Sequence, residues 1–201
     1  LEMARAPEAT LCGRMLAAAT AAGLTPLDVQ TTLVNFVVAG YQSTTFLIGT
    51  GILNLLDPAN AAQRALLRAR PELMSAAVNE MLRHDAPAQV VDRVVAADTT
   101  LGGVDLPRGT HVTLVIGSAN RDETVFADPD AFEIERPDAR SAIPFGAGIH
   151  HCIGAPLVGI VGPTAIGRLL AAFPDMAVDG LVQWQTDPYL RAPANVPLVI
   201  G

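Results

Sequence analysis

The chain has 201 residues, half of them hydrophobic, which is enough for one domain with a packed core and excludes a disordered or fibrous protein. A formal charge of −7 with no arginine-rich face argues against nucleic acid and anionic membranes as partners. Cys12 and Cys152 are the two cysteines, and without a secretory signal pattern they indicate a reducing compartment, so a cytoplasmic location is expected.

The first part of the sequence has the periodicity of helices. The predicted helices cover residues 8–22, 26–56, 59–68 and 71–83. Gly23 separates the first two, and Thr25 with Asp28 three residues later is a helix-start signal. The uncharged stretch 31–56 is long enough to cross a bilayer, but its many polar side chains favour a buried central helix, and no membrane partner is expected.

The second part alternates between strand and loop patterns. The predicted strands cover residues 90–95 and 110–116, with a turn at 100–104 between them. A loop-rich stretch, 120–148, is typical of a shaped surface or cofactor wall. A helix is predicted from near Cys152 to Ala172, and one or two short strands are predicted in the tail from Val178. The expected fold class is mainly α with small β-sheets.

The most informative segment runs from Phe145 to Gly154, where glycines precede a cysteine at the start of a helix. Glycine lets the backbone approach a flat cofactor without Cβ clashes. A helix N-terminus offers N–H groups and positive potential, which favour an anionic sulfur. On the residues alone, a cysteine in this place is more often a small buried hydrophobe, and that reading stays open.

The spacing of Phe, Gly, His, Cys and Gly in this segment resembles the cysteine-ligand loop of cytochrome P450 enzymes. The resemblance implies a cytochrome P450-like fold, represented here by its carboxy-terminal half: a long distal helix, a Glu-x-x-Arg helix and the cysteine-ligand loop. It implies that Cys152 is the metal ligand of haem b, iron protoporphyrin IX. Phe145, Gly146, His150 and Gly154 are then cofactor-binding residues.

Other motifs of the family occur in the expected order. Glu80 and Arg83 match the Glu-x-x-Arg pair, and Arg136 matches the residue that joins it in a structural ion pair. The alternative for Glu80 and Arg83 is a solvated surface pair that contributes little. Arg93 and His150 match the positions that contact haem propionates, for which their donor groups are suited.

The stretch from Ala39 to Thr44 corresponds to the distal helix where the family passes over the haem. Ala39 and Gly40 are therefore cofactor-binding candidates, and Gln42, Ser43 and Thr44 are catalytic candidates. The family usually has an acid followed by Thr where this chain has Gln42 and Ser43. Gln42 cannot ionise, so a proton relay would use water or another group. Thr44 is either a substitute or a helix-packing residue.

Two further departures from the family stand out. Residues 1–201 are expected to be a single P450-like haem domain whose amino-terminal half is absent, through fragmentation, cleavage or a shortened gene product. The Gly162-Pro163 pair is expected to kink or shorten the helix after the cysteine.

Three functions are compatible with these features. The first is a haem-thiolate monooxygenase that oxidises a small apolar organic or natural-product substrate with O2 and electrons from ferredoxin and its reductase, peroxide-driven oxidation being a variant. The second is a catalytically degenerate relative that acts as scaffold or activator of a biosynthetic enzyme. The third is a helical domain without a cofactor. His84, His111 and His151 are interpreted as surface residues, and packing is favoured over pocket lining for Trp184 and Tyr189.

Overall fold

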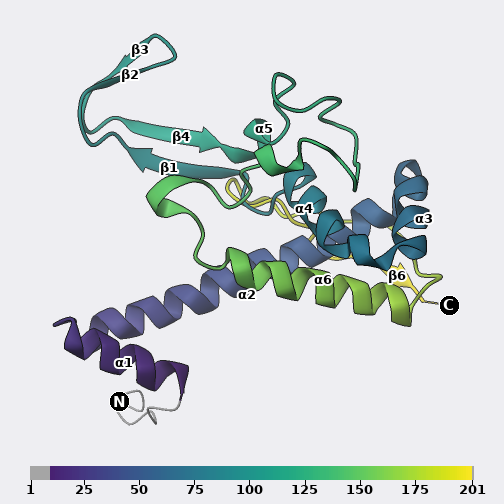
Figure 1. Cartoon of the computed structure of the whole chain (residues 1–201), viewed down its shortest axis with the longest axis horizontal. Helices are drawn as coiled ribbons and strands as arrows, with labels where there is room; N and C mark the ends of the chain where they lie inside the picture. The colour runs from purple at the N-terminus through teal and green to yellow at the C-terminus, as the bar shows by residue number, and fades with distance from the viewer. Residues whose placement is uncertain (1–9, 201) are drawn as a thin grey trace. The chain divides into compact units, whose positions relative to one another are not determined.

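The computed structural model describes residues 10–200, whose helices and strands are labelled in Figure 1. These residues fall into two compact units that divide between Gln42 and Ser43, within one long helix. The expectation of a single domain over residues 1–201 stays a prediction.

The first unit contains α1 (Leu11–Ala21) and the beginning of α2 (Pro26–Leu56). Gly23 has a φ of +74°, the left-handed conformation that ends helices and that glycine adopts without strain. Thr25 and Asp28 confirm the predicted helix start: the backbone N–H of Thr25 donates to Asp28 Oδ2 at 2.7 Å, and that of Asp28 donates to Thr25 Oγ1 at 3.2 Å. Residues 8 and 9 of the first predicted helix lie outside the described residues.

The second unit is built on the rest of α2 and the short helices that follow it. They are η2 (Pro58–Asn60), α3 (Ala61–Ala69), η3 (Pro71–Leu73) and α4 (Met74–His84). The prediction of helices at 59–68 and 71–83 is confirmed, with a 3-10 turn opening each one. Both turns begin at a proline, whose fixed φ and missing N–H suit a helix start.

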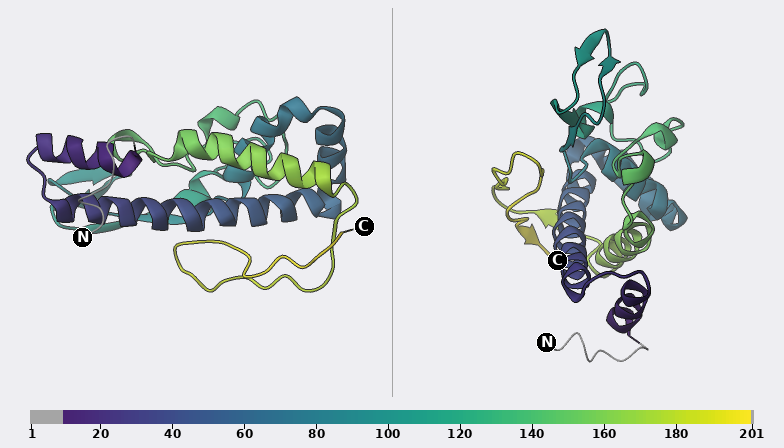
Figure 2. Two further views of the ribbon diagram at one scale, coloured as in Figure 1. Left: turned by 90° about the horizontal axis from the view of Figure 1, so that it is seen from below. Right: turned by 90° about the vertical axis from the view of Figure 1, so that its left-hand side faces the viewer.

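Helix α6 (Ala155–Ala172) lies along α4 and the Ser43–Leu56 part of α2 (Figure 2). The three helices approach closely at glycines. A Cβ on Gly162 would lie 3.1 Å from Val78 and 3.4 Å from Leu47. The core beneath them includes Leu47, Leu55, Val78, Met81 and Ile166, each 1% exposed or less.

Helix α6 continues through Pro163 to Ala172, so the expected shortening is wrong. Pro163 removes the hydrogen bond that the carbonyl of Gly159 would accept. Gly159 is exposed, however, and water can satisfy that carbonyl. Packing of Gly162 against α4 and α2 supplies the stabilisation that holds the helix together across the proline.

The prediction that 31–56 forms a buried central helix holds for its second part alone. Phe46, Leu47, Ile52 and Leu55 are buried, whereas earlier apolar side chains such as Tyr41 are exposed. By length and composition, α2 and α6 are each able to cross a membrane; 28% and 11% of their most apolar windows are buried. Core helices of water-soluble proteins pass the same test.

Three antiparallel two-stranded sheets complete the second unit as described up to residue 200. The strand pairs are β1 (Val90–Val94) with β4 (His111–Val115), β2 (Thr99–Leu101) with β3 (Val104–Leu106), and β5 (Ala177–Val178) with β6 (Leu198–Val199). Gly102 and Gly103 have positive φ values, which makes their turn a tight hairpin. The remaining elements are α5 (Ile116–Ala119), η4 (Ala139–Ser141) and η5 (Gly148–His150). The fold is mainly α with small sheets, as predicted.

Candidate functional site

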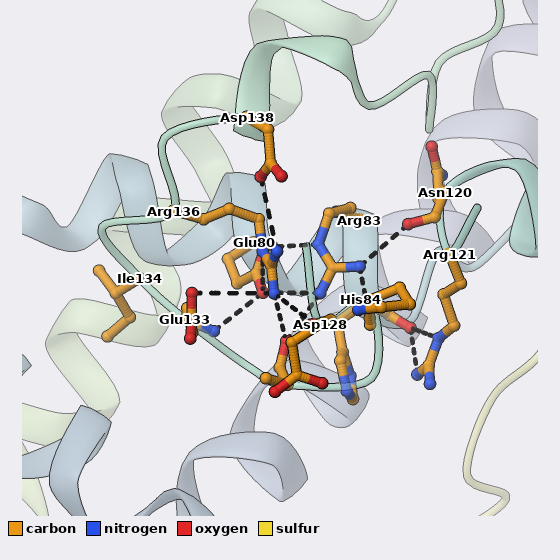
Figure 3. Close-up of polar contacts among 12 residues, drawn as sticks. Glu80, Arg83, His84, Asn120, Arg121, Asp128, Glu133, Ile134, Arg136 and Asp138 are labelled. Carbon is orange, nitrogen blue, oxygen red and sulfur yellow. Dashed lines mark hydrogen bonds and ion pairs between the residues drawn. The ribbon is translucent and has the colours of Figure 1, made fainter. Parts of the chain in front are cut away.

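Glu80, Arg83 and Arg136 meet in the interior of the second unit (Figure 3). Glu80 and Arg83 lie one turn apart on α4, and Arg136 comes from the loop that follows α5. Their relative exposures are 0%, 1% and 5%, respectively. The alternative of a solvated surface pair is therefore wrong.

Arg83 uses all five of its N–H donors. Nε and Nη2 donate to the two carboxylate oxygens of Glu80 at 2.7 and 2.8 Å. The other bonds go to the backbone carbonyls of Asn120, Pro129 and Ala131, at 2.8 to 2.9 Å. A buried guanidinium is tolerated only when paired and fully hydrogen-bonded, and this one is both.

Arg136 binds the same loop from its other end. Its Nε lies 3.3 Å from Glu80 Oε1, and its Nη atoms donate to the carbonyls of Ala127, Asp128 and Ala131 at 2.6 to 3.0 Å. Asp128 has a φ of +45°, an uncommon value for a residue other than glycine. The two arginines thus fix the path of residues 120–138 mainly through backbone carbonyls, and this loop leads directly to the segment with Cys152.

The Phe145–Gly154 segment is a closed loop at the N-terminal end of α6. The backbone N–H of Cys152 donates to the carbonyl of Phe145 at 3.0 Å. Gly146 and Gly148 have φ values of +69° and +70°, so both positions require glycine. Cys152 lies two residues before the N-cap residue Gly154, and its backbone carbonyl accepts the N–H of Ala155, the first residue of α6, at 3.3 Å.

The sulfur of Cys152 belongs to an exposed residue, so the reading of a buried hydrophobe is wrong for this cysteine. A Cβ on Gly154 would lie 3.6 Å from Sγ, whereas Cβ atoms on Gly146 and Gly148 would meet no atom within 4 Å. Ile149 and Ile153 are 97% and 79% exposed. An accessible thiol, open glycine backbone and exposed apolar side chains fit a flat, apolar, iron-containing group such as haem.

Arg93 and His150 both belong to the second unit. Among residues 10–200, no hydrogen bond joins one to the other. Arg93 lies in β1, half-buried, and its Nη1 donates to the carbonyl of Asp92 at 2.8 Å. His150 is exposed at the end of η5. Both side chains keep donors available for an anionic group.

The candidates on the distal helix fall on both sides of the unit boundary. Ala39, Gly40 and Gln42 belong to the first unit, and Ser43 and Thr44 belong to the second. Gly40 lies within α2, and a Cβ built on it would meet no atom within 4 Å. The roles of these five residues towards haem stay predictions.

Sequence reasoning missed the part played by His84 and Asn120. His84 is half-buried rather than a surface residue, and its ring packs edge-on against Phe132 at 5.7 Å. Burial and the charge of Arg121 lower its pKa below 6.5. Asn120 is fully buried, accepts a bond from Arg83 and accepts another from the N–H of Ile143 at 2.7 Å. No signal short of the fold would have found either role.

Comparisons with known proteins agree with this geometry. The family model for cytochrome P450 matches residues 9–173. The chain is 41% identical over 169 residues to the vitamin D(3) 25-hydroxylase of Pseudonocardia autotrophica, and 36% identical over 183 residues to the polyketide biosynthesis cytochrome P450 PksS of Bacillus subtilis. These matches cover 82% and 89% of this chain.

Solved structures give the same result. P450BioI, in complex with an acyl carrier protein ligated to hexadec-9Z-enoic acid, is similar over 100% of this chain, with a TM-score of 0.92 and 30% identity. The chain spans 41% and 44% of the two curated relatives and 51% of the P450BioI chain. On sequence, fold and the arrangement around Glu80 and Cys152, the chain belongs to the cytochrome P450 family.

Proposed function

We propose that this chain provides the haem-thiolate portion of a cytochrome P450 monooxygenase, with Cys152 as the ligand of the iron in haem b. The observation that supports this proposal most directly is the closed loop that presents the Cys152 thiol at the N-terminal end of α6. Beside the thiol lie exposed isoleucines and two glycines at which a Cβ would meet no atom within 4 Å. With a thiolate ligand, haem supplies the activation of O2 that allows one oxygen atom to enter a substrate.

The residues of the cysteine loop have separate tasks in this proposal. The positive potential at the N-terminal end of α6 favours the thiolate form of Cys152. Gly154 leaves the sulfur uncovered on the side where a side chain would touch it. Arg93 and His150 donate hydrogen bonds to the carboxylates of the cofactor, and charge-assisted bonds of this kind hold an anionic group firmly.

The distal residues are assigned to oxygen access and proton supply. Ala39 and Gly40 are small and leave room beside the helix backbone. Ser43 has a hydroxyl that can accept one proton and donate another, and Thr44 offers the same chemistry one residue later. Gln42 cannot release a proton, so its task is to orient water by hydrogen bonding.

The relatives support a small, apolar substrate and a bacterial electron-transfer system. One relative is named as a hydroxylase of vitamin D(3), and the P450BioI structure contains a long-chain fatty acid on its carrier protein. We assign ferredoxin and its reductase as the electron source, and the cytoplasm as the location without membrane insertion. A natural-product pathway is supported by the polyketide biosynthesis enzyme among the relatives.

The test is the visible absorption of the reduced, carbon monoxide-treated protein after reconstitution with haem. We expect the red-shifted Soret band of thiolate ligation in the parent and in Cys12→Ser, and its loss in Cys152→Ser. Cys12 is the matched control because it is the other free cysteine and is partly buried in the first unit. Absence of the band from the parent, or its survival in Cys152→Ser, would refute the assignment.

A second function, a catalytically degenerate scaffold or activator, is favoured by one observation: Gln42 stands where the family usually has an acid. It predicts haem uptake without oxidation of substrate when ferredoxin, reductase and O2 are supplied, and no gain in Gln42→Glu. The monooxygenase proposal predicts turnover in the parent and a change in its pH dependence in Gln42→Glu.

A further inference from the structure

The carboxy-terminal tail contains a short strap, Asp187–Arg191, that runs beside the connection between α4 and β1 (Figure 1). The backbone N–H of Gln89 donates to the carbonyl of Tyr189 at 2.8 Å, and that of Arg191 donates to the carbonyl of Pro87 at 2.9 Å. An antiparallel bridge pairs Ala88 with Leu190. The strap is therefore paired, through one isolated bridge and two backbone hydrogen bonds, with a segment distant in sequence.

Arg191 fastens the strap by its side chain as well. Its Nε lies 2.7 Å from Oδ1 of Asp85, the C-cap residue of α4, and its guanidinium carbon lies 4.2 Å from the ring centroid of Trp184. The Asp85 side chain is 12% exposed and the Arg191 side chain is 48% exposed, so water screens this pair from the arginine side and less from the aspartate side. Stacking on an aromatic face further restricts the guanidinium.

The strap is itself a fixed turn. Oδ1 of Asp187 accepts the backbone N–H groups of Tyr189 and Leu190 at 2.7 and 2.9 Å. A hydrogen bond with Asp92 raises the pKa of the Tyr189 hydroxyl, and Asp92 also accepts the hydroxyl of Thr113 at 2.6 Å. The hydrogen bonds and the ion pair of the strap thus fall along the connection itself, at Asp85, Pro87 and Gln89.

Arg93 follows directly in β1, and its recorded hydrogen bond is to the neighbouring carbonyl of Asp92. The path of the connection, together with the pairing of β1 with β4, therefore influences where the guanidinium of Arg93 points. We propose that Arg191 is a positioning residue that holds the Asp85–Gln89 connection and thereby aims Arg93 at the cofactor's carboxylates. This inference rests on the proposed haem function.

The test combines haem titration with the fluorescence of Trp184, the single tryptophan of the chain. The variants are Arg191→Met, which keeps the stem and removes the fork, Arg93→Gln, and the double variant. Arg140→Met is the matched control, because Arg140 is exposed and has no recorded side-chain partner among the described residues. Haem binding and tryptophan quenching are compared between variants under conditions in which the circular dichroism spectrum of each variant matches that of the parent.

We expect Arg93→Gln to weaken haem binding about tenfold or more in the parent, as for loss of a charge-assisted hydrogen bond. In the Arg191→Met background the same change should have a clearly smaller effect, because Arg93 is already misdirected. Arg191→Met should also make Trp184 easier to quench with acrylamide, and Arg140→Met should change neither quantity.

The possible failures are distinguishable. If the parent takes up no haem, the proposed function is overturned and the role of Arg93 falls with it. If haem binds normally but the effects of Arg191→Met and Arg93→Gln multiply independently, the positioning role alone is overturned. Unchanged quenching of Trp184 in Arg191→Met would also overturn it, because the stacking that holds the strap would be missing.

Discussion

Arg83→Lys isolates the contribution of hydrogen-bond geometry to the buried network, because it keeps the positive charge beside Glu80. Arg83 makes five hydrogen bonds, and a lysine ammonium has three donors, so at least two bonds are lost. At about 1.5–3 kcal/mol for each bond to a charged group, the free energy of unfolding should fall by about 3–6 kcal/mol. Domains of this kind have only about 5–15 kcal/mol in total.

The assay is urea unfolding followed by far-ultraviolet circular dichroism, with thermal unfolding as a second measure. The midpoint temperature should drop by roughly 6–24 °C. Arg70→Lys is the control, because Arg70 pairs with Glu72 and Glu135 on the surface, where the same loss of fork geometry should change little. Equal stability of Arg83→Lys and the parent would refute the view that this network fixes the 120–138 loop.

Three further changes have defined outcomes. Because the pKa of His84 is lowered in the folded state, the unfolded chain takes up a proton at this residue at a higher pH than the folded chain does. The free energy of unfolding should therefore be full above about pH 6.5 and decline below it. His84→Gln should flatten this dependence in urea midpoints measured at pH 7.5 and 5.5. Pro163→Ala should raise the free energy of unfolding, measured in urea, by about 1–2 kcal/mol, since the carbonyl of Gly159 regains its helical hydrogen bond. A lower urea midpoint than that of the parent would contradict this account. Gly154→Val should weaken haem uptake, because the new Cβ would face Sγ of Cys152. The φ of −81° at this position suits a valine, so no backbone strain is expected. Unchanged affinity in a haem titration would show that this side of the sulfur is not used.

Local sequence signals predicted the elements that depend on local chemistry. The boundaries of α2 follow from the Thr25 and Asp28 capping bonds at its start and from Pro58 beyond its end. The cysteine loop was recognisable because positive φ values restrict Gly146 and Gly148 to glycine, which leaves a mark in the sequence.

Features that depend on long-range packing were not predictable in this way. Helix α6 survives Pro163 because Gly162 is held against Val78, a contact between residues far apart in the chain. The sequence predicts a turn where β2 and β3 lie, because three residues on each side of Gly102 and Gly103 give too little alternation to identify a strand. His84 looks like any polar residue at a helix end until Phe132 is known to cover it.

The position of Cys152 is set from both directions by one helix. On one face of α4, Glu80 and Arg83 hold the loop that leads into the cysteine segment. On another, Val78 packs against Gly162 of α6, the helix that begins just after the cysteine. Because both anchors lie within six residues of the same helix, from Val78 to Arg83, a shift of α4 would move both ends of the segment together. The chain therefore mounts its candidate ligand on a rigid helix, and the loop between the anchors needs only glycines and one hydrogen bond to keep its shape.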